Sequence, residues 1–323
     1  MKPENTPPAP EIPSPPPVSS SSRSNSLHKL PFLLDPRAPE GPWNSYPSAW
    51  FGKAQVWFGR AQQGLVSSEE AGRHGDPAMA RAAEIDPNLS QVQAQLAGQL
   101  VWSRWDWAGG EEAFLRALES DPTDSFSRGY YSQLLFYLKR DEEALREVER
   151  AAELDPFNSL TQAVYAQDLN FLHRYADAER VLLGILERDP ESPYALSTLR
   201  TTYHLMGRES DAMRMFRASY VALGDMEAVA ALDSGYEAGG YSAGLLAVAE
   251  LFVARSDTTF VTPWQIATLY TRAGDAELAL NYLERAFEAR DQNMPSISVD
   301  PIFDFLRDEP RFQTLVDRLG LPR

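Results

Sequence analysis

Apolar residues in the middle of the chain recur at helical spacing, in short stretches separated by polar turns. Tyr131, Leu134 and Leu138 are three and four positions apart, which places them on one face of a helix. A new stretch starts at Asp141 with three acidic residues, and a stripe of small apolar residues such as Ala144 follows. Because acidic side chains are favourable at the positive end of a helix, this pattern predicts two amphipathic helices joined by a short turn.

The two-helix pattern repeats along the chain. Each copy ends on an aspartate followed by a proline, namely Pro87, Pro122, Pro156 and Pro190 in successive copies. Proline stops a helix because it lacks the backbone N–H group and clashes with the preceding turn. The regular spacing of these prolines, about 34 residues, indicates stacked helix pairs rather than one globular core. We therefore predict an all-α fold, an α-solenoid of stacked helix–turn–helix repeats.

The pattern divides the chain into five segments. They are a disordered leader rich in proline and serine (1–50), a degenerate helical unit (51–88), regular repeats (89–224), an irregular glycine-rich helical unit (225–258), and a last repeat with a C-terminal capping helix (259–323). The leader holds 13 of the 24 prolines and nine serines. Such a composition buries too little apolar surface to offset the entropy of ordering the chain, so we expect it to be disordered.

The small and large positions of each copy, followed by proline, resemble the tetratricopeptide repeat (TPR). The stretch from Thr262 to Ala286 and the tail from Val299 to Pro322 resemble the last repeat and the end of bacterial signalling proteins. In those proteins such an array often follows a kinase, winged-helix or nucleotide cyclase domain. The resemblance covers roughly 77–323 and implies a protein-interaction scaffold with no catalytic site of its own.

The resemblance also implies a binding surface. In this repeat class the first helix of each pair lines a concave groove and faces a bound peptide. The candidate groove residues at these positions are Phe126, Gln133, Phe136, Gln167, Asn170, Tyr194, Thr201 and His204. The set is neutral and lacks the lysine and asparagine clamp of chaperone-binding relatives, which disfavours a chaperone co-factor. The alternative is that these residues only coat a solvated groove.

Composition narrows the choice of partner. The chain has no cysteine, which excludes disulfides, thiolate metal ligands and cysteine nucleophiles. The formal net charge is −16, and the acidic surplus lies in 51–323. Phosphate backbones and anionic lipids repel an acidic body, so we expect neither a nucleic-acid nor a membrane partner. The start of the chain shows no secretory signal and no apolar run is long enough for a membrane span, so we expect a cytoplasmic protein.

The sequence shows no pattern of catalytic residues. The four histidines are far apart, and none has a carboxylate or serine placed by a recognisable motif. No glycine-rich phosphate loop and no alternating acidic loop for calcium is present. We therefore expect no enzyme activity, no cofactor, no metal site and no small-molecule substrate. The alternative, an enzyme with a site hidden in the groove, would need a titratable residue such as His204.

Two further features are open to more than one interpretation. Trp102, Trp105 and Trp107 gather at one inter-helix turn, where they either pack under the loop or form a binding hot spot, and we favour packing. For function, we favour a scaffold or adaptor that binds a protein or peptide partner in bacterial signalling or complex assembly. The alternative is a regulatory companion or remnant of a TPR-linked kinase or transcription activator whose effector domain is absent from this chain.

Overall fold

The computed structural model describes residues 42–62 and 64–322, and in these ranges the secondary structure is helical with no strand. The predicted all-α solenoid is confirmed. The first 41 residues of the expected leader lie outside the described residues. The remaining part is folded, because η1 (Pro42–Ser45) is a 3₁₀-helix and α2 (Pro47–Gln62) begins before the boundary expected at residue 50. Proline suits the first turn of a helix, and an aromatic stripe gives α2 a face to bury.

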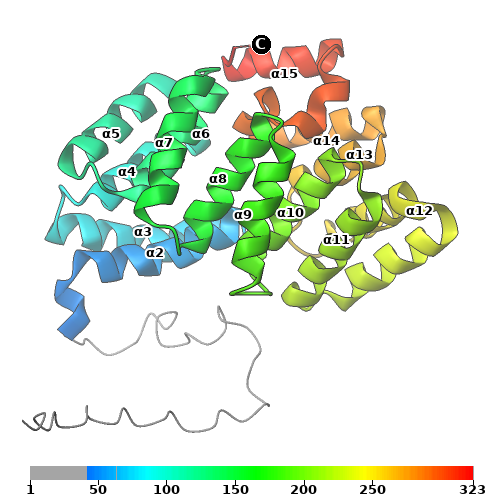
Figure 1. Cartoon of the computed structure of the whole chain (residues 1–323), viewed down its shortest axis with the longest axis horizontal. Coiled ribbons are helices and arrows are strands. Elements are labelled where there is room, and N and C mark those ends of the chain that lie inside the picture. Colours follow the sequence, from blue (N-terminus) through cyan, green and yellow to red (C-terminus); the bar gives the residue numbers. More distant parts are fainter. Residues whose placement is uncertain (1–41, 63, 323) are drawn as a thin grey trace, which may run out of the picture. The chain divides into compact units, whose positions relative to one another are not determined.

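Antiparallel helix pairs follow one another along the chain (Figure 1). The N-terminal pair is α2 with α3 (Ser68–Ile85). The regular pairs are α4 (Ser90–Gly98) with α5 (Trp107–Ser120), α6 (Ser125–Tyr137) with α7 (Asp141–Leu154), α8 (Ser159–Phe171) with α9 (Tyr175–Leu186), and α10 (Pro193–Leu205) with α11 (Glu209–Leu223). A short π-helix, η2 (Gln99–Arg104), extends α4.

The C-terminal half continues with longer and then shorter elements. These are α12 (Met226–Arg255), α13 (Pro263–Ala273), α14 (Ala276–Glu288), the 3₁₀-helices η3 (Met294–Ser298) and η4 (Pro301–Leu306), and α15 (Pro310–Leu319). Among the helices of the described ranges, none has both the length and the apolar character that crossing a membrane requires.

One left-handed residue marks the turn inside each helix pair. Its φ lies between 57° and 84°, and the residues are Trp105, Lys139, His173, Gly207, Gly240 and Gly274. Each of them follows the one before it after about 34 residues. A left-handed residue after a helix ends it and redirects the chain, so the backbone itself repeats with the period seen in the sequence.

The glycine-rich segment is a helix pair as well. Arg255 forms ion pairs with Asp225 at 2.6 Å and with Glu227 at 2.7 Å, at the other end of α12. In a straight helix these residues would be about 40 Å apart, so α12 folds back on itself. It does so at Gly239 and Gly240, where the backbone leaves the helical region. The segment expected to be irregular therefore keeps the repeat and only shortens its turn.

The core is continuous through the repeats but separate in the N-terminal pair. One cluster of buried residues runs from Ala94 to Leu321. Residues of α2 and α3 such as Phe51 and Met79 form two smaller clusters, and Phe126 packs against one of them. The α2–α3 pair is thus joined to the repeats by a limited apolar contact.

The C-terminal segment packs against the first regular repeats. Trp107 Nε1 donates a hydrogen bond to the Leu319 carbonyl at 3.0 Å, although the residues are 212 positions apart. The Trp105 ring lies 4.9 Å from that of Phe287, and Trp102 packs edge-on against Tyr130 at 5.1 Å. The packing interpretation of the three tryptophans is confirmed, and two of them reach the far end of the array.

Candidate functional site

The eight candidate residues all belong to first helices of regular repeats. Helices α4, α6, α8 and α10 pack side by side as an inner layer. The candidates are on α6 (Phe126, Gln133, Phe136), α8 (Gln167, Asn170) and α10 (Tyr194, Thr201, His204). The structure brings them into this layer but does not leave them on one open surface.

Three candidates are buried within the protein. Phe136 is 1% exposed, Asn170 2% and Gln133 4%. Gln133 donates a hydrogen bond to Gln167 Oε1 at 3.3 Å, and Asn170 donates one to Thr202 Oγ1 at 3.0 Å. The amide groups of Gln133 and Asn170 thus bond to the next repeat, whereas the Phe136 ring contributes to the lining of a pocket described below. The binding role expected of these residues stays a prediction.

Two other candidates contact α2. The ring of Phe126 meets that of Phe51 edge-on at 5.4 Å, and a Cβ added at Gly59 would lie 3.3 Å from the Tyr194 hydroxyl. Between these points, Gln55 donates a hydrogen bond to Gln95 Oε1 at 2.6 Å. Helix α2 therefore lies along α4, α6 and α10, and part of the expected groove is filled by the chain itself.

The candidate Gln167 is half-buried and accepts the hydrogen bond from Gln133. The remaining two candidates contact the C-terminal half of the array. Thr201 Oγ1 accepts a hydrogen bond from Arg272 of α13 at 2.9 Å. His204 Nδ1 lies 3.2 Å from the Tyr241 hydroxyl. Burial lowers the pKa of His204 to about 3, with a further contribution from the charge of Arg272. His204 is therefore neutral at pH 7, and no carboxylate of the described residues hydrogen-bonds to it.

The inner layer also holds an acid that the sequence did not single out. Asp168 is fully buried on α8, and its Oδ2 lies 2.6 Å from Ser132 Oγ of α6. Its other carboxylate oxygen has no partner among the described residues, and burial raises the pKa of Asp168 well above its usual value. The sequence offered one signal for this residue, which is that an acidic side chain stands among apolar residues at helical spacing.

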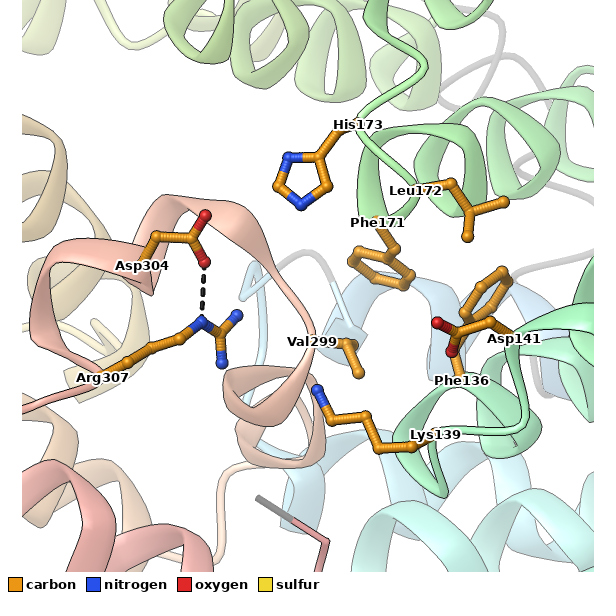
Figure 2. Close-up of a pocket in the computed structure, with 9 residues that line it drawn as sticks. All are labelled: Phe136, Lys139, Asp141, Phe171, Leu172, His173, Val299, Asp304 and Arg307. Carbon is orange, nitrogen blue, oxygen red and sulfur yellow. Dashed lines mark hydrogen bonds and ion pairs between the residues drawn. The ribbon is translucent and has the colours of Figure 1, made fainter.

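A pocket of 350 Å³ lies where the C-terminal segment faces the ends of α6 and α8 (Figure 2). It is lined by Phe136, Lys139, Asp141, Phe171, Leu172, His173, Val299, Asp304 and Arg307. Arg307 pairs with Asp304 at 2.7 Å, and Lys139 donates to the Ser298 carbonyl at 2.6 Å. Burial and the charge of Arg307 lower the pKa of Lys139.

Most polar groups in this pocket, namely Lys139, His173, Asp304 and Arg307, already have partners within the protein. His173 lies 2.7 Å from the Tyr175 hydroxyl rather than from an acid. Within the described ranges, no three His, Asp or Glu residues converge as metal ligands would. The pocket is therefore a polar recess between the C-terminal segment and the ends of α6 and α8.

Helix pairs recur about every 34 residues, a left-handed residue lies in each turn, and the first helices form an inner layer. These features define an α-solenoid with the repeat architecture that the sequence resembles. The resemblance seen in the sequence is confirmed at the level of the fold. The narrower resemblance to signalling proteins stays a prediction. No family model matches the chain, and no curated protein matches it in sequence.

Solved structures similar to this fold are tetratricopeptide repeat proteins. One from Parabacteroides merdae has a TM-score of 0.47 at 13% identity, covering 84% of this chain and 99% of that one. PilW, described as a type IV pilus biogenesis factor, has a TM-score of 0.41 at 16% identity, covering 81% and 99%. YrrB, described as having an unusual peptide-binding site, has a TM-score of 0.35 at 17% identity, covering 56% and 88%. The likeness is one of repeat architecture.

Proposed function

We propose that this protein is a non-enzymatic interaction scaffold that binds a helical segment of a partner protein on its inner layer, at the place where α2 lies. The observation that supports this proposal is the packing of α2 on the first helices of the repeats. Helix α2 is amphipathic and is held against first helices of the repeats by the Phe51–Phe126 ring contact and the Gln55–Gln95 hydrogen bond. A surface that holds one amphipathic helix in this way offers the same apolar and amide contacts to another.

The packing of α2 supports an exchange of this kind. Phe51 and Ala54 belong to a cluster shared with α3 and with Val92 of α4, and this cluster is separate from the continuous core of the repeats. Displacing α2 from the inner layer would leave that core intact. A tethered helix is present at a high effective concentration, so a partner must bind more tightly than α2 does or must first be concentrated nearby.

Charge indicates the chemistry of the partner. The formal net charge of the chain is −16. A partner helix with a basic polar face would be steered toward this body and would bind faster at low salt. We therefore propose a protein partner with an apolar stripe and basic flanks, in bacterial signalling or complex assembly. Identification of a kinase or a DNA-binding protein as that partner would instead favour the companion role.

A synthetic peptide with the sequence of residues 47–62 tests the surface directly. Phe51→Ala in the full chain weakens the seating of the tethered helix. The labelled peptide should then bind this variant at least about tenfold more tightly than the wild type, because a larger fraction of the surface is free. Fluorescence anisotropy measures both affinities.

A second substitution provides the control. Adding Phe126→Ala to Phe51→Ala should abolish peptide binding, whereas adding Phe157→Ala should leave it unchanged, because Phe157 is 79% exposed and lies on no first helix. The circular dichroism spectra of all variants should match that of the wild type. Absence of peptide binding to the Phe51→Ala chain would refute the proposed surface.

A further inference from the structure

Two arginines that pack on the same aromatic ring lie close enough to interact electrostatically. Arg200 is on α10 and Arg272 is on α13. Their guanidinium carbons lie 4.8 Å and 6.0 Å from the centroid of the same ring, that of Phe216. Each forms no ion pair with any residue of the described ranges. Most other arginines of the repeats pair with acids, so these two are exceptional.

The hydrogen bonds of the two side chains are incomplete. Arg272 is 8% exposed and donates to Thr201 Oγ1 at 2.9 Å and to the Thr268 carbonyl at 3.1 Å, but its Nε has no partner among the described residues. Arg200 is half-buried and makes no hydrogen bond to any described residue, and its Nε is buried. Buried N–H groups of a guanidinium left without acceptors are costly.

The surroundings do not neutralise the two charges. His204 is neutral and bonds to the Tyr241 hydroxyl. Burial and the charge of Arg272 lower the pKa of Arg200 to about 10, so the group stays charged at pH 7. Asp300 interacts with Arg272 electrostatically, but its carboxylate accepts from the Ile302 backbone at 3.1 Å and forms no ion pair with either arginine. An uncompensated buried charge destabilises a protein unless a counter-ion is supplied.

We propose that Arg200 and Arg272 form a binding site for a phosphate-type oxyanion. Two guanidinium groups present forks of N–H donors that match the oxygens of phosphate, and a dianion balances both charges where a carboxylate would balance one. Arg200 is half-buried, so part of its side chain stays in contact with solvent. The ligand is either free phosphate or a phosphomonoester, since both offer the same oxygens. This site is independent of the surface occupied by α2.

Calorimetric titration of the full chain with inorganic phosphate, at pH 7 and constant ionic strength, tests the site. Arg200→Gln should weaken binding by at least about tenfold, because charge-assisted hydrogen bonds are lost. Arg180→Gln is the matched control and should bind as the wild type does, since the Arg180 side chain is 75% exposed. Parallel titration with phosphoserine identifies the source. Binding of phosphoserine indicates a phosphomonoester ligand, and binding of inorganic phosphate alone indicates the free ion.

Stability of the phosphate-free protein gives a second measurement. Arg200→Met keeps the length of the side chain and removes the charge, so the unfolding temperature without phosphate should rise and should no longer respond to phosphate. The proposal is overturned if phosphate gives no heat with the wild type, if Arg200→Gln binds equally well, or if Arg200→Met lowers the unfolding temperature. The last result would show that Arg200 serves only to pack on Phe216.

Discussion

The regular repeats and the N-terminal pair are built from the same kind of helix but pack differently. Both regions bury alanines completely where two helices cross, as at Ala144 and at Ala54. The repeats share one continuous core, whereas α2 and α3 form two small clusters, one of which also includes Val92 of α4. An amphipathic helix pair is therefore enough to make a hairpin but not enough to make it stack in the array.

The register of the turns explains the difference. In the repeats, inner-layer hydrogen bonds join residues about one period apart, such as Gln133 to Gln167, 34 positions on. The corresponding bond from the N-terminal pair, Gln55 to Gln95, spans 40 positions. Its left-handed turn residue, Gly64, likewise precedes Trp105 by clearly more than one period. With its turn out of register, the pair lies across the inner layer instead of extending it.

The largest expected effect tests whether the regular repeats and the N-terminal pair unfold as one cooperative unit. Leu169→Ala removes a fully buried side chain of the continuous core and should lower the free energy of unfolding by about 2–5 kcal/mol. Met79→Ala makes a comparable cavity in the N-terminal pair. It should raise amide exchange only within α2 and α3, as measured by hydrogen–deuterium exchange. Equal acceleration throughout the repeats would show that the two regions unfold as one unit.

A smaller effect tests the packing inside the repeats. Ala144→Leu inserts a large side chain where α6 and α7 meet and should destabilise the protein by about 1–3 kcal/mol in urea unfolding. Ala176→Leu introduces the same side chain at an exposed position of α9 and should change stability by less than about 0.5 kcal/mol. A neutral result for Ala144→Leu would contradict the repeat register.

The smallest expected effect concerns Asp168, which has no counterpart in the N-terminal pair. Its pKa is raised by burial in the folded state, so the unfolded state loses this proton at lower pH than the folded state does. The contribution of Asp168 to stability is therefore lost as pH rises above about 4, the value in unfolded chains. Asp168→Asn cannot ionise and should be more stable than the wild type at pH 7, with the difference shrinking toward pH 4. Thermal unfolding across this range measures it, and a less stable variant at pH 7 would show that the carboxylate is needed.

The spacing of apolar residues predicted the helices and their period well. The stripe through Tyr131, Leu134 and Leu138 belongs to α6, and the prolines that mark the repeat lie between pairs. The glycine-rich segment was harder to interpret because its turn is reduced to Gly239 and Gly240, which leaves no polar loop in the sequence. Local patterns therefore predicted the helical repeat but not the turn inside α12.

The use of the groove residues for binding stays a prediction. The residues expected in the groove do share the inner layer, but Gln133, Phe136 and Asn170 are buried there. Their burial depends on how tightly successive repeats pack, which small differences at many inter-helix contacts decide together. Arg200 drew no attention in the sequence because a charged residue on an amphipathic helix normally faces solvent.

The sequence by itself determined the paired helices, the constant period at which they recur and the repeat class, because these follow from residue spacing within one or two helices. Only the tertiary structure decided that α2 lies on the inner layer, that Arg200 meets Arg272, and that Trp107 reaches Leu319 across 212 positions. Contacts between such distant residues depend on the curvature accumulated over many repeats, and no local pattern of residues records that curvature.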